Sequence, residues 1–155
     1  MVNLKVGDLG SPFSLKDQNG QFVDLHDLKG KKVLLSFHPL AWTNICKLQM
    51  QSLEENYQKF QQLNTTALGF SVDSVPCKKA WAKEIKVEKT SLPADFWPHG
   101  GVAELYGIFR EKEGFSERAN IILDEEGKII FFKIYEIKEL PDINEVLSFL
   151  ENYSA

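Results

Sequence analysis

The chain has 155 residues and a formal net charge of −4, with 43% hydrophobic and 26% charged residues. This length and balance are typical of one globular domain spanning residues 1–155. The sequence has no basic stripe with interleaved aromatic residues, so we expect no nucleic-acid partner. It also lacks an apolar run of the roughly 18 residues that a membrane span needs. The N-terminal residues do not follow the pattern of a signal peptide, so we expect a cytoplasmic protein with reduced cysteines.

The first half of the chain predicts a hairpin, a buried strand and a helix. Residues 13–25, FSLKDQNGQFVDL, have apolar residues on both sides of an Asn-Gly pair, which is a strong hairpin signal. The nearly continuous apolar run at residues 32–38 predicts a strand that is buried on both faces. After a proline break, Thr43 or Asn44 can cap a helix. Apolar residues at three- and four-residue spacing over residues 53–60 give that helix one inward face.

The second half alternates strands and helices in an order typical of an α/β fold. We predict, in chain order, a strand at residues 65–73, a helix from Pro76, an irregular stretch at 91–97, a short helix at 101–108, a hairpin around residues 126–127 and a final amphipathic helix at 142–153. A β-α-β unit followed by an antiparallel hairpin and a helix predicts a central mixed sheet flanked by helices. The thioredoxin fold has this core order, and the N-terminal β-hairpin would be an extension of it.

Cys46 lies just inside the helix that follows the first buried strand, and it is one of only two cysteines in the chain. A cysteine in the first turn of a helix faces unpaired backbone N–H groups and the positive end of the helix dipole. Both favour the thiolate, which is the reactive form, over the thiol. The alternative interpretation is that Cys46 is a small buried hydrophobic residue, as many free cysteines are.

The helix end alone is not sufficient to make Cys46 a good nucleophile. A free thiol is only a few per cent ionised at neutral pH, and about 3 kcal/mol of differential stabilisation is needed to reverse that balance. A helix dipole supplies roughly 0.3–1 kcal/mol, and about 2 kcal/mol at best. We therefore expect a cation from elsewhere in the chain, and an arginine hydrogen bond of about 1.5–3 kcal/mol would be enough.

The residues around Cys46 form the pattern P-x-x-x-T-x-x-C, from Pro39 through Thr43 to Cys46, directly after a buried strand. This pattern resembles the active-site loop of the peroxiredoxins. The resemblance continues in order through SVDSVPCKKAWA, DFWPHGGVAELYGIF and GFSERANIILDEEGKI, and it covers nearly the whole chain. With PLAWTNIC and DFWPHG, the chain is most similar to the alkyl hydroperoxide reductase E type, its one-cysteine relatives and the bacterioferritin comigratory protein type.

The resemblance implies a thiol-dependent peroxidase with an antioxidant role, which reduces hydrogen peroxide and organic hydroperoxides without a cofactor. Cys46 would be the peroxidatic cysteine and would become a sulfenic acid, which a thiol reductant such as thioredoxin or glutaredoxin then reduces. Thr43 would hydrogen-bond the peroxide, Pro39 would shield the sulfur from water, and Arg118, in SERAN, would contact both the sulfur and the peroxide. Relatives often pair through the loop beside the active site, so we expect a homodimer, with Trp42 as a candidate contact.

Cys77 is a candidate resolving cysteine, which would form a disulfide with the oxidised Cys46. Some relatives have a resolving cysteine on the helix in this part of the fold. Against that role, Cys77 lies at the very start of its predicted helix, where many relatives carry a serine or a non-catalytic cysteine. A bridge would also require two Cα atoms within about 7 Å. If Cys77 does not resolve, the enzyme uses an external thiol.

Other residues near the motif bear on these predictions. Gln49 stands where the family commonly has a glutamate that holds the arginine, and an amide accepts a hydrogen bond but offers no charge. His26, His38 and His99 are scattered without metal-ligand spacing, so we expect no metal site and a packing and hydrogen-bonding role for His38. Because Cys46 is not part of a C-x-x-C motif, a dithiol oxidoreductase of the thioredoxin type is disfavoured.

Two other functions are alternatives to the peroxidase. A peroxide sensor would use the same sulfenic acid at Cys46 but would pass the oxidation to a protein partner. A redox-inactive binding module on the same scaffold would be expected to lack Thr43 or Arg118, and both are present.

Overall fold

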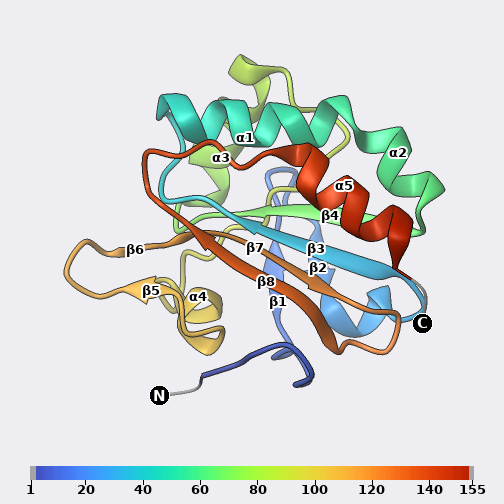
Figure 1. Cartoon of the computed structure of the whole chain (residues 1–155). Helices are drawn as coiled ribbons and strands as arrows, with labels where there is room; N and C mark the ends of the chain where they lie inside the picture. The colour runs from blue at the N-terminus through green and yellow to red at the C-terminus, as the bar shows by residue number, and fades with distance from the viewer. Residues whose placement is uncertain (1–2, 154–155) are drawn as a thin grey trace.

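A computed structural model of the chain describes residues 3–153 (Figure 1). Its centre is a four-stranded mixed sheet in the order β4-β3-β7-β8, made of β3 (Lys32–Phe37), β4 (Thr65–Phe70), β7 (Arg118–Leu123) and β8 (Ile129–Tyr135). Strands β3 and β4 are parallel, whereas β7 is antiparallel to both β3 and β8. Within residues 3–153, no helix has both the length and the apolar character needed to cross a bilayer.

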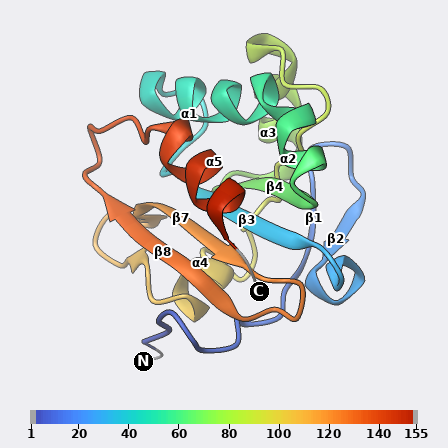
Figure 2. The ribbon, with the colours of Figure 1, turned by 45° about the vertical axis from the view of Figure 1, so that its right-hand side comes forward.

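Most of the helices cover one face of this sheet. They are α1 (Asn44–Glu55), α2 (Tyr57–Gln62), α3 (Val75–Ile85) and α5 (Ile143–Asn152). Their buried side chains form one hydrophobic cluster with Leu34 of β3 and Ile122 of β7, which point to the same face. Figure 2 shows α1, α2 and α5 together on this side of the sheet. Burial of this shared apolar surface is what holds the helices on the sheet.

The opposite face of the sheet is covered by α4 (Gly101–Leu105) and by the N-terminal segment. Phe13 joins a second cluster with α4 and with the alternate residues of the strands, including Val33, Leu35 and Ile121. All six residues of β7 are buried, and so are five of the six residues of β3. This pattern is typical of central strands that are covered on both faces, as the apolar run at residues 32–38 predicts.

The predicted N-terminal hairpin is confirmed as β1 (Ser14–Lys16) paired antiparallel with β2 (Phe22–Asp24). Asp17 stabilises the turn, because its Oδ1 accepts hydrogen bonds from the backbone N–H groups of Asn19 and Gln21. The Gln18 side chain ties the turn to the body of the molecule through hydrogen bonds with the backbone of Thr90 and Leu92. A short 3-10 helix (Leu25–Leu28) then leads into β3.

The element order confirms the thioredoxin-like fold with an N-terminal β-hairpin extension, but three details differ from the sequence-based prediction. The helix after Pro39 is interrupted at Asn56, whose side-chain Nδ2 donates to the Ser52 carbonyl and whose backbone is not helical. The strand predicted at residues 65–73 ends at Phe70. An additional hairpin of β5 (Phe109–Arg110) and β6 (Phe115–Ser116) was not predicted, since strands of two residues carry no periodic signal.

Candidate active site

The candidate site lies at the end of the sheet where β3 and β4 terminate and β7 begins, on the left in Figure 1. Residues 38–43 lead from β3 into α1, and the loop after β4 leads into α3. The β3-α1-β4 crossover therefore brings the N-terminal end of α1 to this edge of the sheet. Cys46 is the third residue of α1 and lies in its first turn, as predicted.

Cys46 and Arg118 form a buried contact between a sulfur and a guanidinium. The side chain of Cys46 is fully buried and that of Arg118 is 3% exposed. Arg118 Nη1 donates to Cys46 Sγ at 3.4 Å, and its Nε donates to the carbonyl of Ile137 at 2.9 Å. Since the contact is shielded from solvent, the cation stabilises negative charge on the sulfur more strongly than it would at the surface. The chain therefore provides the cation that the energetic argument requires.

Gln49 holds Arg118 from the next turn of α1. Its Oε1 accepts from Arg118 Nη1 at 2.8 Å, and its Nε2 donates to Ser36 Oγ at 2.8 Å and to the carbonyl of Phe37 at 3.1 Å. Gln49 is thus oriented by both strand β3 and the arginine. Within residues 3–153, no carboxylate lies within ion-pair distance of the guanidinium. The amide therefore positions Arg118 without neutralising its charge.

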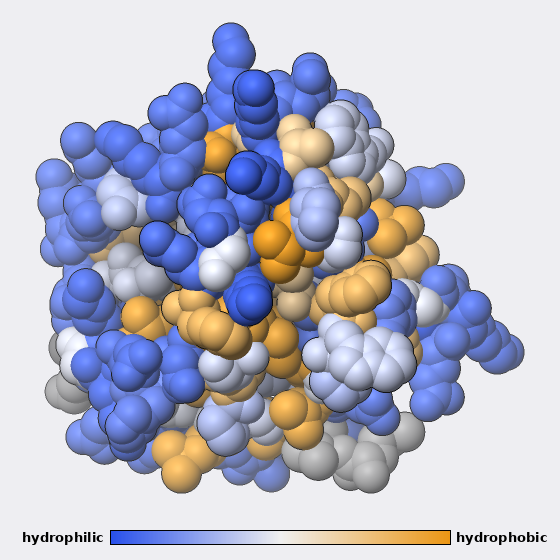
Figure 3. Space-filling view, turned by 180° about the vertical axis from the view of Figure 1, so that it is seen from behind, coloured by the Kyte–Doolittle hydropathy of each residue, from blue (hydrophilic) through white to orange (hydrophobic). Residues whose placement is uncertain are grey.

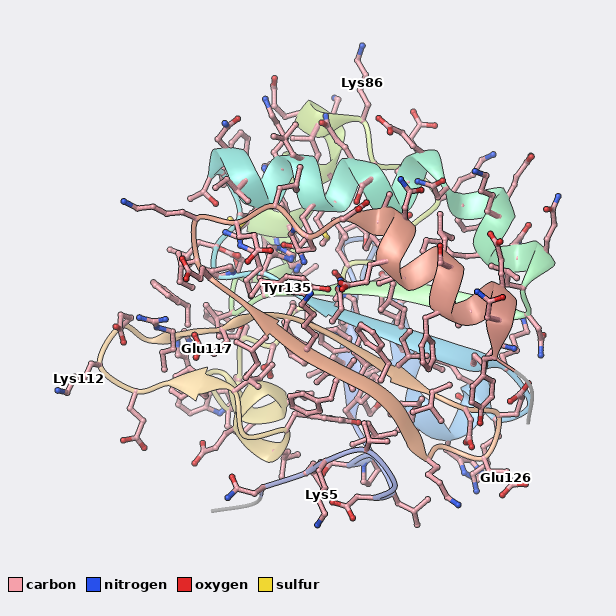
Figure 4. All side chains as sticks on the ribbon, viewed as in Figure 1. Lys5, Lys86, Lys112, Glu117, Glu126 and Tyr135 are labelled. Atoms are coloured by element: carbon pink, nitrogen blue, oxygen red, sulfur yellow. The ribbon has the colours of Figure 1, made fainter. Side chains whose placement is uncertain are left out.

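The strand that carries Arg118 is itself tied to β8 and α5. Arg118 pairs with Tyr135 across the β7–β8 register. The Tyr135 hydroxyl, between β8 and the helix layer in Figure 4, donates to Glu145 Oε1 at 2.6 Å, and burial raises the pKa of this phenol. Glu117, also labelled in Figure 4, accepts from Arg110 at 2.8 Å. The residue that pairs with Arg118 on β8 and the residue that precedes Arg118 in sequence are therefore both fixed by side-chain contacts.

Thr43 and Pro39 lie on the loop that enters α1. Thr43 occupies the N-cap position, but its side chain makes no capping hydrogen bond. Its hydroxyl instead donates to the carbonyl of Leu40 at 2.7 Å, which leaves the oxygen able to accept from another group. Thr43 is exposed and Pro39 is buried. The intervening Trp42 has φ of 68°, a left-handed conformation that is unusual for a residue with a side chain.

His38 is a neutral packing residue beneath the site. Its ring lies 5.3 Å from that of Trp81, and neither ring nitrogen has a hydrogen-bond partner among residues 3–153. Burial, followed by the charges of Lys78 and Arg118, keeps the pKa of His38 well below its usual value. The packing role expected for His38 is present, but the expected side-chain hydrogen bond is absent among the described residues.

Cys77 lies at the start of α3, as predicted, and both cysteines are free thiols. Its backbone N–H donates to Ser74, the N-cap residue, and its Sγ donates to Asp73 Oδ1 at 3.8 Å. Burial, together with the neighbouring Asp73 carboxylate, raises the pKa of the Cys77 thiol. Cys77 is therefore held in its protonated form, which is the weak nucleophile.

In the part of the chain that the structure describes, no group of three or more His, Cys, Asp or Glu side chains is arranged to hold a metal ion. His99 is on the opposite side of the fold from the helix layer, in contact with the carbonyl of Gly114 at 2.7 Å.

Comparison with known proteins identifies the family. The AhpC/TSA family model matches residues 6–132. Alkyl hydroperoxide reductase E from Mycobacterium tuberculosis is 38% identical over 140 residues, which are 90% of this chain and 91% of that protein. The chain belongs to the AhpC/TSA family. Peroxiredoxin Bcp from Escherichia coli is 31% identical over 135 residues, which are 83% of this peroxiredoxin and 85% of that protein.

Solved structures agree with this assignment. A reduced 2-Cys peroxiredoxin from Plasmodium vivax superimposes with a TM-score of 0.87 at 25% identity, over 94% of this chain and 80% of that one. Enterococcus faecalis AhpC gives a TM-score of 0.87 at 27% identity, over 97% and 92% of the two chains. This peroxiredoxin is a thiol-dependent peroxidase, and the relatives do not favour the sensor alternative.

One group of polar residues beside the site was missed in the sequence: the buried Ser71 and Lys78, and the partly buried Asp73. Lys78 is fully buried, and its sequence signal is its spacing. It is three, four and seven residues before Trp81, Ala82 and Ile85, which are the other buried residues of α3. A lysine on the apolar stripe of a helix must find polar partners inside the protein, and this rule would have singled it out.

Proposed function

We propose that this peroxiredoxin reduces hydrogen peroxide and small organic hydroperoxides with Cys46 as the attacking nucleophile. The observation that supports this assignment is the 3.4 Å contact between Arg118 Nη1 and Cys46 Sγ, both buried at the first turn of α1. The helix end and the guanidinium both stabilise negative charge on this sulfur. Cys77, in contrast, donates to a carboxylate, which disfavours its thiolate.

The chemistry of the first step is a displacement at oxygen. The Cys46 thiolate attacks one peroxide oxygen, a sulfur–oxygen bond forms and the weak oxygen–oxygen bond breaks. The electron pair of that bond leaves with the second oxygen as hydroxide or alkoxide, which takes up a proton to give water or an alcohol. Arg118 would stabilise the charge that develops on the leaving oxygen, as preorganised donors do in other enzymes.

Thr43 and Pro39 would shape the space in which the peroxide binds. The Thr43 oxygen has acceptor capacity beyond its bond to Leu40, so it would accept the peroxide hydrogen and orient the molecule for in-line attack. Pro39 is a buried residue of the loop and has no N–H to hydrogen-bond water, so it would keep water away from the sulfur. Both roles require the loop from β3 to α1 to hold one conformation.

We propose that an external thiol, rather than Cys77, reduces the Cys46 sulfenic acid. The raised pKa of Cys77 and its contact with Asp73 support this choice, because the attacking group in disulfide formation is a thiolate. The first thiol attacks the sulfenic sulfur and releases water to give a mixed disulfide, and a second thiol then frees Cys46. Thioredoxin and glutaredoxin are the candidate reductants.

Intact mass after one equivalent of peroxide separates the two routes. An added oxygen on Cys46 with an alkylatable Cys77 is expected for the external-thiol route, and a loss of two hydrogens would show an internal disulfide.

We also propose a cytoplasmic homodimer in which residues 1–155 act as one domain. Two free cysteines fit a reducing compartment. Trp42 is 55% exposed beside the active-site loop, and Phe96 and Trp97 are 50% and 80% exposed. The face turned away from the viewer in Figure 1 carries apolar patches among hydrophilic residues (Figure 3). Sedimentation of the wild type and of Trp42→Glu tests the dimer, which the charged variant is expected to weaken.

The decisive test of the proposed function is peroxide consumption with a dithiol reductant. The wild type is expected to turn over hydrogen peroxide, Cys46→Ser to lose all turnover, and Cys77→Ser to keep it. Full turnover by Cys46→Ser would show that the nucleophile has been assigned to the wrong residue.

A further inference from the structure

Lys78 is a buried cation that the peroxidase mechanism above does not use. Its side chain is fully buried on α3, and its Nζ donates to the Gly69 carbonyl at 3.2 Å and to Ser71 Oγ at 2.8 Å. In the described part of the chain, no carboxylate lies within ion-pair distance of this ammonium. Burying a lysine without a direct counter-ion is unfavourable, so the hydrogen bonds of Lys78 must offset the loss of its hydration.

The hydrogen bonds of Lys78 continue to the active-site loop. Ser71 Oγ accepts from the ammonium, and the Ser71 hydroxyl in turn donates to Asp73 Oδ2 at 2.6 Å. The same carboxylate oxygen accepts from the backbone N–H of Ala41 at 2.8 Å. Three successive contacts therefore join α3 to the loop between Pro39 and Thr43.

The loop needs such a restraint. Ala41 precedes Trp42, whose left-handed backbone at φ 68° is unfavourable for a residue with a side chain. Thr43 follows, and its side chain does not cap α1. The Asp73 carboxylate is thus the polar anchor that holds the loop at Ala41, and the ammonium and the serine hydroxyl fix the orientation of that carboxylate.

Lys78 shares its buried surroundings with the reactive groups of the site. Burial lowers its pKa to about 7, against the opposing effect of nearby acidic groups. The titratable groups that face it are Asp73 and Asp95 from loops, Cys77 on α3, Cys46 on α1 and His38 after β3. The ammonium is therefore close enough to interact electrostatically with both sulfurs, and its charge changes near neutral pH.

We infer that Lys78 is a positioning residue for the peroxidase reaction, which acts through Ser71 and Asp73 to fix the backbone at Ala41 and so to present Thr43 to the peroxide. This inference rests on the role proposed above for Thr43. Two functions of the network can be distinguished: orientation of the loop affects only reactions that use Thr43, whereas the charge of Lys78 affects every reaction of the Cys46 sulfur.

Two reactions of Cys46 separate orientation from charge. The first is the second-order reaction of the reduced enzyme with hydrogen peroxide, followed by tryptophan fluorescence. The second is alkylation of Cys46 by iodoacetamide, followed by mass spectrometry, which needs the thiolate but no peroxide orientation. Ser71→Ala removes the middle of the network and leaves Lys78 in place. Ser91→Ala is the matched control, because it removes a serine-to-carboxylate bond of 2.9 Å to Asp17, outside the loop.

We expect Ser71→Ala to slow the peroxide reaction about tenfold, with alkylation of Cys46 within about twofold of the wild type. Lys78→Met, which keeps the size of the side chain and the folded core, is expected to slow the peroxide reaction at least as much. Ser91→Ala should change neither rate. A wild-type peroxide rate in either Ser71→Ala or Lys78→Met would overturn the inference, and so would an equal slowing of both reactions in Ser71→Ala.

Thr43→Val distinguishes a failure of this inference from a failure of the proposed function. If Thr43→Val itself reacts at the wild-type rate, the role of Thr43 in orienting the peroxide is wrong. If Thr43→Val is slow and Ser71→Ala is not, only the positioning role is wrong. Under the inference the two substitutions act through one interaction, so the double variant should be no slower than Thr43→Val alone.

Discussion

Replacing Gln49 by glutamate tests the electrostatics of the site most directly. The 2.8 Å and 3.4 Å contacts that Arg118 Nη1 makes with Gln49 and Cys46 place Gln49 Oε1 no more than about 6 Å from the sulfur. A carboxylate there would repel a thiolate by about 3 kcal/mol at an effective dielectric constant of about 20. That energy corresponds to roughly a hundredfold change in the ratio of thiolate to thiol.

Part of this penalty is offset, because a carboxylate holds Arg118 by a charge-assisted hydrogen bond. We therefore expect Gln49→Glu to react with hydrogen peroxide about tenfold to a hundredfold more slowly than the wild type at pH 6, with the gap closing as the pH rises. The variant also loses the two hydrogen bonds that the amide donates to Ser36 and Phe37. Each lost bond costs about 1 kcal/mol of unfolding free energy, so the melting temperature should fall.

The assay is stopped-flow measurement of the peroxide rate from pH 5 to pH 9. Gln51→Glu is the matched control, since Gln51 is on the same helix and donates to the Ile85 carbonyl at 3.1 Å without contacting Arg118. A peroxide rate for Gln49→Glu equal to or above that of the wild type at pH 6 would contradict this prediction. It would mean that the firmer hold on the arginine outweighs the added negative charge.

Three further outcomes follow from the same contacts. Arg118→Met should slow the peroxide reaction by about tenfold to a hundredfold, because a charge-assisted hydrogen bond of about 1.5–3 kcal/mol is lost at the sulfur. Single-turnover rates measure this change, and an unchanged rate would contradict the role of Arg118 at the sulfur. Lys78→Met should change the pH dependence of stability. With a pKa of about 7 in the fold and an ordinary value when unfolded, the wild type gains stability as the pH rises from 7 to 10, by up to a few kcal/mol relative to the variant in urea titrations. A difference in unfolding free energy between the wild type and Lys78→Met that does not change with pH would contradict this prediction. Asp95→Ala should lower the unfolding free energy by about 2–3 kcal/mol in the same titrations, because the buried carboxylate of Asp95 accepts from the N–H groups of Val102 and Ala103 at 2.9 Å. A loss of unfolding free energy below about 0.5 kcal/mol would contradict this prediction.

Much of the fold is predictable from the sequence, because its local patterns agree with one another. The Asn-Gly turn, the apolar run of β3 and the amphipathic α5 each carry a strong periodic or turn signal. What the sequence does not predict depends on single residues or on distant contacts. The break at Asn56 depends on one side-chain hydrogen bond, and β5 and β6 are too short to have a period.

The site is predictable only in part for the same reason. The position of Cys46 in the first turn of α1 follows from the local pattern, and a need for a cation follows from its energetics. Arg118, 72 residues away in sequence, is identified only through the family resemblance, since no local rule brings β7 to α1. The path from Lys78 to Ala41 joins three separate segments, so it becomes visible only in the folded chain.

The uncharged Gln49 amide that holds Arg118 has a consequence for inhibition. A guanidinium that is held by an amide is not neutralised by its holder, so its charge acts on the Cys46 sulfur and on whatever occupies the space beside that sulfur. Small anions such as azide or thiocyanate should therefore compete with uncharged hydrogen peroxide for this space, beyond the general screening effect of salt. The working rate of the enzyme would then depend on the anions of its surroundings as well as on the concentration of oxidant.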